Sequence, residues 1–469
     1  MKTVLMLFCL SRLKKISKYG MLSFCAVLIV YVYTPFNIDT FSYNTIPLMG
    51  LLYIITILNS NRQSIIEAFL CGIVISFVVL SQPFCALIYL FLIIYFGGGI
   101  ILGNKKYFEE NNNRLPYLVN SKGMLWFTAG IVFVSVVFFI IVFSRASFTD
   151  VVNNVSVIFS DPDHKTDGII GWIGKLWWGA YGFIFEYKII TAINFLTVMF
   201  LFITKRKIKT EVLTGVVVVI FFISSIYVLA KRDSFLGTLV FVPCLWMLLE
   251  VYIIFFKALM KREYIPGILI FLGYTAGIAF ATNTGYLSVT AGVVIAVAYT
   301  FMVLEKSVEG RIDKILKAVA FFILGETMIS HVVAIGDGFL NFSEYKYVIE
   351  QGPLKGTITD KKIFDSYNKV IDDLKVVMPL EEDAVLFCGT STPMAYLYLD
   401  AEYSTYGPYF LDMNYDRYKL YLKMHPDKYP SIVYYESLDD KDRESFLYDY
   451  VINNYSIIIQ DGESFIAKK

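Results

Sequence analysis

The sequence predicts an α-helical polytopic membrane protein with a small α/β domain at its carboxyl end, and three observations indicate this fold class. The chain of 469 residues is 57% hydrophobic and 17% charged, with a mean hydropathy of +0.61, whereas a soluble domain is nearer half apolar and a quarter charged. Apolar runs of about 20 residues recur, which is the length of a helix that crosses about 30 Å of hydrocarbon. From residue 341 onward these runs stop, and Lys, Asp and Tyr become frequent.

We expect about eleven spanning helices, because a backbone in lipid must satisfy its own hydrogen bonds. The amino-terminal stretch MKTVLMLFCL lacks a small-residue cleavage site, so we interpret it as the end of a membrane helix in a chain that starts late relative to its relatives. The approximate cores of the predicted spans are residues 20–36, 42–58, 64–82, 84–103, 124–143, 183–204, 211–230, 235–256, 265–282, 286–304 and 314–334.

The chain is therefore predicted to contain a transmembrane domain, residues 1–340, and a soluble extracytoplasmic domain, residues 341–469. In the second domain short strand-like runs alternate with helical ones, and the chain ends in a pair of strands. This alternation predicts an α/β layer with a largely parallel sheet. The predicted elements are helices at Ile363–Val377, Thr392–Leu399, Arg417–Met424 and Arg443–Val451, and strands at Ala384–Cys388, Ser431–Tyr435, Tyr455–Gln460 and Ser464–Ala467.

Basic residues in short loops predict the orientation, since cytoplasmic loops carry an excess of Lys and Arg. Basic clusters such as Arg12–Lys18, Lys205–Lys209 and Lys257–Arg262 alternate with loops that are poor in basic residues. We therefore expect a cytoplasmic amino terminus and an outer carboxyl domain. Lys231 and Arg232 are the exception on the outer side. They can hold a polyprenyl phosphate, with Arg as a bidentate fork, or form a surface ion pair of little energy.

Charge and cysteine usage exclude two other classes of protein. The net charge of +1 gives no basic footprint for nucleic acid. The six cysteines form no C-x-x-C pair, and five of them lie in or beside apolar runs. They are typical of small buried residues and not of a zinc site or a disulfide framework.

Acidic residues on the predicted outer side are the candidates for catalysis. Asp39 lies in the loop Phe36–Phe41, where it can deprotonate an acceptor or cap the following helix. Asp161, Asp163 and His164 follow within the long segment between two spans. Asp161 and Asp163 can act as catalytic carboxylates, and the three residues together can bind a divalent cation. The alternative is a turn in which the Asp side chains accept hydrogen bonds from the backbone.

Two further groups of side chains lie at or within the apolar runs. Trp172, Trp177 and Trp178 are predicted to anchor the chain at the membrane interface, with stacking against a sugar as the alternative. Glu250 and Glu326 lie inside apolar runs, where an ionisable residue is a functional candidate by default. The sequence does not indicate a partner for either carboxyl group.

The runs Thr40–Leu58 and Ile66–Tyr95 carry an aromatic, Asn-bearing helix entry at Tyr43-Asn44 and a helix that runs from Gly72 to Ser81-Gln82-Pro83. This pattern resembles the middle helices of bacterial polytopic glycosyltransferases of the GT-C type, the superfamily of the dolichyl-phosphate-mannose and aminoarabinose transferases. Such enzymes usually carry an acidic first outer loop between their first two helices, and no long acidic loop of that kind is present here. The resemblance therefore implies an amino-terminally truncated member, which can be inactive because it lacks this loop.

The resemblance implies an inverting transfer of a sugar from a polyprenyl-phosphate donor to an envelope glycan, lipid or protein on the outer face. Two other functions stay open. A transporter or flippase of lipid-linked glycan predicts charged side chains near the middle of the membrane. A non-catalytic membrane protein with a partner-binding tail is the third hypothesis, and the missing first loop favours it.

Overall fold

The computed structural model describes most of the chain in two compact units. The helical unit comprises Met1–Ala146 and Thr166–Leu340, and the carboxyl-terminal unit comprises Ser147–Lys165 and Asn341–Lys469. The described residues are 2–14, 20–33, 44–60, 64–101, 121–152, 171, 174, 177–178, 181–182, 184–230, 239–281, 286–335, 344–380, 383–389, 394–407, 415–460 and 464–469.

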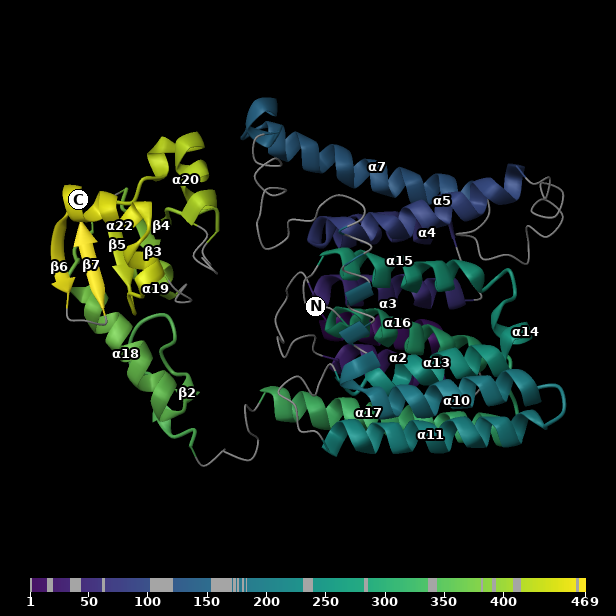
Figure 1. Cartoon of the computed structure of the whole chain (residues 1–469). Coiled ribbons are helices and arrows are strands. Elements are labelled where there is room, and N and C mark those ends of the chain that lie inside the picture. Colours follow the sequence, from purple (N-terminus) through teal and green to yellow (C-terminus); the bar gives the residue numbers. More distant parts are fainter. Residues whose placement is uncertain are drawn as a thin grey trace. The chain divides into compact units, whose positions relative to one another are not determined.

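The helical unit consists of long apolar helices that run back and forth beside one another (Figure 1). These helices are α1 (Lys2–Lys14), α2 (Met21–Val32), α3 (Thr45–Asn59), α4 (Ile65–Ser81), the short η2 (Pro83–Cys85), α5 (Ala86–Ile101), α7 (Ser121–Phe143), α10 (Lys188–Thr204), α11 (Thr210–Ala230), α13 (Val242–Ile254), α14 (Phe256–Leu259), α15 (Ile265–Ala281), α16 (Tyr286–Leu304) and α17 (Arg311–Ile335).

Each of the eleven predicted spans falls on one of these helices, and α1 is an additional one. Among the described residues, two helices are long and apolar enough to cross a membrane, at Lys122–Phe143 and Thr210–Ala230. Several of the other apolar helices are shorter. The 12 residues of α2, for example, extend over about 18 Å at 1.5 Å per residue. The prediction of helices is thus confirmed, whereas the crossing of a membrane by all eleven stays a prediction.

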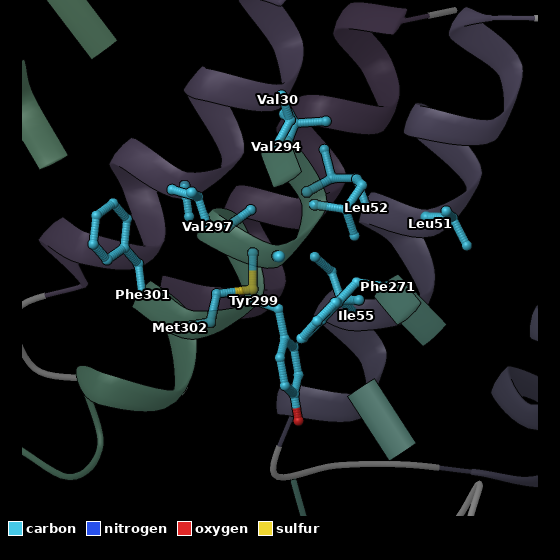
Figure 2. Packing of buried hydrophobic residues seen from close by; sticks show 14 of the residues in the cluster. Val30, Leu51, Leu52, Ile55, Phe271, Val294, Val297, Tyr299, Phe301 and Met302 are labelled. Carbon is cyan, nitrogen blue, oxygen red and sulfur yellow. The ribbon is translucent and has the colours of Figure 1, made fainter. Parts of the chain in front are cut away.

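The core of the helical unit lies between α2, α3, α15 and α16. Figure 2 shows Val294 and Val297 of α16 among side chains of α2 and α3, including Val30 and Leu52. Tyr299 of α16 fixes α15 at its start, since its hydroxyl donates a 2.7 Å hydrogen bond to the carbonyl oxygen of Tyr264.

Helices α4 and α7 approach each other more closely than any side chain would allow. A Cβ atom built on Gly72 of α4 would lie 2.0 Å from the carbonyl oxygen of Phe127, and one on Gly130 of α7 would lie 2.2 Å from that of Phe69. Small residues permit such contact between helix backbones in membranes. The hydroxyl groups of Tyr89 and Thr128 add a 2.8 Å hydrogen bond between α5 and α7.

The other side of α7 is an exposed apolar surface. Leu125 and Ile140 are 68% and 65% exposed, and Val132, Phe133 and Phe139 are at least half exposed. A contiguous surface of this kind is unfavourable in water and marks contact with another apolar phase or partner.

The carboxyl-terminal unit is built around a five-stranded sheet with the strand order β4-β3-β5-β7-β6. β3 is parallel to β4 and β5, whereas β7 is antiparallel to β5 and β6. The elements are β1 (Tyr347–Val348), β2 (Ile358–Thr359), α18 (Lys361–Lys375), β3 (Val385–Cys388), α19 (Met394–Leu399), β4 (Glu402–Tyr403), α20 (Tyr415–Met424), η5 (Pro426–Lys428), β5 (Ile432–Tyr435), α21 (Asp440–Arg443), α22 (Phe446–Asn454), β6 (Ser456–Gln460) and β7 (Phe465–Lys468).

Alternate residues of the central strands point to opposite faces of this sheet, as the pleat requires. Leu386 and Tyr434 pack with α18 and α19 on one face, while Phe387 and Tyr435 pack with α20 and α22 on the other. The strands and helices predicted here are confirmed. The parallel arrangement is confirmed only for β3, β4 and β5, because the terminal strand pair joins the sheet as an antiparallel hairpin.

Candidate functional site

Most of the residues predicted to carry chemistry lie outside the described part of the chain. Their roles therefore stay predictions; these residues are Asp39, Asp161, Asp163, His164, Trp172, Lys231 and Arg232. Trp177 and Trp178 are described and are 69% and 68% exposed. The Trp178 ring packs edge-on against Tyr181 with centroids 5.6 Å apart. Such exposure fits both interfacial anchoring and stacking against a sugar.

One end of the helical unit is held together by charged side chains from the predicted cytoplasmic loops. The Glu305 carboxylate accepts hydrogen bonds from the backbone N–H groups of Leu22 and Ser23, at 3.1 and 3.0 Å, and from the Ser23 hydroxyl. It thereby caps α2, whose own N-cap residue gives no side-chain bond. Lys306 Nζ donates a 2.6 Å hydrogen bond to the carbonyl oxygen of Asn59 at the end of α3. Each charge has the sign that favours the helix end it contacts.

The same end includes the start of α4. Arg12 of α1 forms an ion pair with Glu67, and Glu67 also completes a capping box with Ser64. The ends of α1, α3 and α16 and the starts of α2 and α4 therefore take part in contacts between loops that the basic-residue pattern assigns to one side.

The opposite ends of several helices carry two pairs of buried polar side chains, which we call together the outer-end cluster after the orientation that the sequence predicts. It consists of Tyr33, Asn44, Gln82 and Thr290, from α2, the start of α3, the end of α4 and α16. The hydroxyl groups of Tyr33 and Thr290 are 3.2 Å apart, and Gln82 Nε2 donates a 3.4 Å hydrogen bond to Asn44 Oδ1.

Asn44 and Gln82 are the polar residues of the two stretches that carry the family resemblance. They are 38 positions apart in the sequence and become neighbours because α3 and α4 are antiparallel and packed together. Both side chains are buried, with 7% and 5% of their surface exposed. At this burial neither side chain offers an open surface to a ligand.

The Tyr33 ring places the start of α13 at this cluster as well. It packs edge-on against Phe241, with centroids 5.1 Å apart and an interplanar angle of 81°. Tyr33 directly precedes the segment 34–43, which contains Asp39, and Phe241 lies three residues after the segment 231–238, which contains Lys231 and Arg232. The described residues that flank these two segments are therefore in contact.

The outer-end cluster contains amide and hydroxyl groups and no charge. Amides both donate and accept hydrogen bonds, and hydroxyls do the same. Such a set suits the neutral hydroxyl groups of a sugar better than it suits a phosphate, which calls for Arg or Lys. Among the described residues, no group of three or more His, Cys, Asp or Glu side chains is arranged to hold a metal ion.

A second buried polar network lies in the carboxyl-terminal unit, after strand β5. The Tyr415 hydroxyl donates a 2.6 Å hydrogen bond to Asp442 Oδ1 and lies 2.9 Å from the Tyr435 hydroxyl. Asp442 Oδ2 accepts a 3.0 Å bond from the backbone N–H of Asp439. Burial raises the pKa of the Asp442 carboxyl above its ordinary value. Since Asp442 also closes a capping box for α21, we assign this network to structure.

The chain matches no protein-family model, no curated protein and no solved structure. The assignment of a function therefore depends on the sequence pattern and on the geometry described above.

Tyr33 and Thr290 are not among the predicted site residues, and Asn44 and Gln82 are predicted only as part of a family pattern. Their polar character is a sequence signal that could have identified them, because all four lie beside or within predicted apolar spans. Which of these ends face one another depends on helix packing, so the sequence cannot show that they form one cluster.

Proposed function

We propose that the helical unit is embedded in a bacterial cytoplasmic membrane as a polytopic bundle of about eleven spans, with the carboxyl-terminal unit in the outer aqueous phase. The exposed apolar side of α7 supports this proposal, since lipid is the phase in which such a surface is stable. The two helices of sufficient length and the loops whose charged side chains cap helix ends at one end of the unit also support it.

Within this arrangement we propose a GT-C-like glycosyltransferase that uses a polyprenyl-phosphate sugar and an envelope glycan, lipid or protein as acceptor. Asp39 is proposed as the base that takes the proton of an acceptor hydroxyl. The hydroxyl oxygen then bonds to the anomeric carbon while the bond from that carbon to the phosphate oxygen breaks. The phosphate leaves with the electron pair, and Lys231 and Arg232 are proposed to stabilise its charge.

A single observation carries this proposal, namely the contact of Tyr33 with Phe241 beside Thr290. The chain continues directly from Tyr33 into the segment with Asp39, and Phe241 closely follows the segment with Arg232. The base acts on the attacking oxygen and the phosphate-binding group on the leaving oxygen, and both oxygens bond to one anomeric carbon. Segments that start from neighbouring points can bring the two groups to that carbon.

The proposal is tested with purified protein in lipid nanodiscs and a panel of radiolabelled polyprenyl-phosphate sugars. Transfer to an envelope lipid extract is expected, and Asp39→Asn and Arg232→Ala are expected to lower kcat/KM by 100-fold or more, an order-of-magnitude expectation for lost acid–base or phosphate contacts. Arg206→Ala, an exposed basic residue of a predicted cytoplasmic loop, is the matched control and should leave transfer unchanged.

Equal activity of all three variants would refute the assigned site, and no transfer with any donor would refute the enzyme. Chelation by EDTA tests Asp161, Asp163 and His164 separately, because a metal role predicts loss of activity that returns with a divalent cation.

A transporter of lipid-linked glycan is the second candidate, and one observation favours it. Glu250 of α13 and Glu326 of α17 are buried inside the helical unit, where the transporter hypothesis expects ionisable groups. Flipping of a fluorescent lipid-linked sugar in proteoliposomes, without any transfer product, would favour this candidate over the enzyme.

A further inference from the structure

Glu326 is a carboxyl group buried between helices with no hydrogen bond to either oxygen. It lies on α17, is 5% exposed, and neither Oε1 nor Oε2 has a partner among the residues that the structure describes. An ionised carboxylate in such surroundings loses its solvation without compensation, which is far more costly than binding a proton. The site therefore demands a cation that neutralises the carboxylate.

One side chain from a neighbouring helix lies close to this carboxyl group. Ser225 of α11 is near enough for its hydroxyl to interact with Glu326, and the Ser225 hydroxyl oxygen is itself buried without a hydrogen-bond partner among the described residues. An acid and a hydroxyl, both without a partner, thus lie near each other on two helices that pack together.

The adjacent serine on α11, Ser224, hydrogen-bonds to a different helix. Ser224 accepts a 3.2 Å hydrogen bond from Asn194 Nδ2 of α10, so its side chain is already engaged. Successive residues of a helix point about 100° apart, which places Ser224 toward α10 and leaves Ser225 for α17. Ser224 is consequently a matched control for Ser225.

Other titratable groups lie on the helices around α17, but none of them hydrogen-bonds to Glu326. Among the described residues, α2 carries Cys25 and Tyr31, α11 carries Glu211 and Tyr227, and α13 carries Cys244, Glu250 and Tyr252. No described Lys, Arg or His side chain lies within hydrogen-bond distance of either carboxyl oxygen of Glu326.

We propose that Glu326, with the Ser225 hydroxyl near enough to donate to it when it is ionised, is a proton-binding site within the helical unit. A proton is the cation that fits, because one carboxylate and one hydroxyl supply far fewer oxygen ligands than the six or more that Ca²⁺ or Mg²⁺ takes. The inference goes beyond the proposed function, since no step of sugar transfer uses Glu326.

Dicyclohexylcarbodiimide tests the proposal, because this apolar reagent modifies carboxylic acids that are protonated in apolar surroundings. The acid proton goes to a carbodiimide nitrogen, the carboxyl oxygen bonds to the central carbon, and the adduct rearranges to a stable N-acylurea. We expect peptide mass spectrometry of the full-length protein in detergent to find this adduct on Glu326, with a yield that falls as pH rises. Exposed Glu211 should not be labelled, and Glu326→Gln should abolish the adduct while keeping the fold.

The two serines separate a proton site from a merely reactive carboxyl group. A hydroxyl that donates to a carboxylate favours its charged form, so in Ser225→Ala we expect labelling to persist to higher pH. Ser224→Ala should keep the wild-type profile. Absence of the Glu326 adduct from folded protein would overturn the proposal, as would identical pH profiles in the two serine variants. Labelling that does not depend on pH would overturn it as well.

Discussion

Replacement of Gly72 by alanine should separate α4 from α7 and destabilise the helical unit. The new Cβ atom would lie 2.0 Å from the Phe127 carbonyl oxygen, whereas ordinary contact begins near 3.4 Å, so α7 has to retreat by about 1.4 Å. A gap of even 0.5–1 Å forfeits roughly a quarter to a half of the van der Waals attraction across it. Overpacking of this kind costs about 1–3 kcal/mol. Alanine returns about 1 kcal/mol of helix propensity, so we expect a net loss of up to about 2 kcal/mol.

Gly215→Ala on α11 is the matched control, because a Cβ atom there meets nothing within 4 Å. That variant should be neutral or more stable by up to about 1 kcal/mol. The six cysteines are all buried, so a thiol-reactive fluorescent dye reports thermal unfolding of each variant in detergent. If Gly72→Ala and Gly215→Ala shift the Tm equally, the backbone contact between α4 and α7 is refuted.

Two further predictions concern the ends of the elements. Glu305→Ala removes the carboxylate that caps α2 and should lower the free energy of unfolding by about 1–2 kcal/mol in the same assay. Glu309→Ala, at an exposed position four residues on, is the control and should cause no measurable loss. Equal losses of stability in the two variants would contradict the cap. Because the pKa of Asp442 is raised by burial, the folded state binds more protons than the unfolded chain between the ordinary carboxyl pKa and the raised one. Its contribution to the free energy of unfolding is therefore lost as pH rises through that window. Asp442→Asn should flatten this part of the pH profile, measured by alkylation of Cys388, the one cysteine of the carboxyl-terminal unit. An unchanged profile would show that Asp442 does not titrate there.

The long helices and the central strands follow from the sequence alone, whereas the two-residue strands β1, β2 and β4 are not predicted by it. A run of about 20 apolar residues is expected to be a helix, because a helix satisfies its own backbone hydrogen bonds. The spacing of apolar residues around Tyr367 follows the period of a helix, and that around Val433 is typical of a strand. The predicted helices and strands consequently agree with those described, within a few residues at most ends. The charged cap at Glu305 and the hairpin position of β7 could not be read in this way, because each depends on a partner far away in the chain.

The candidate sites show the same division. In the sequence, Asn44, Gln82 and Glu326 are polar residues within or beside apolar runs. Such residues are functional candidates, because burying a polar group costs free energy. Only the packing of the helices decides that Asn44 meets Gln82 and that Ser225, not Ser224, faces Glu326. Hydropathy and periodicity are sums over neighbours in the chain, whereas a site is formed by a few contacts between helices whose relative rotation no local pattern records.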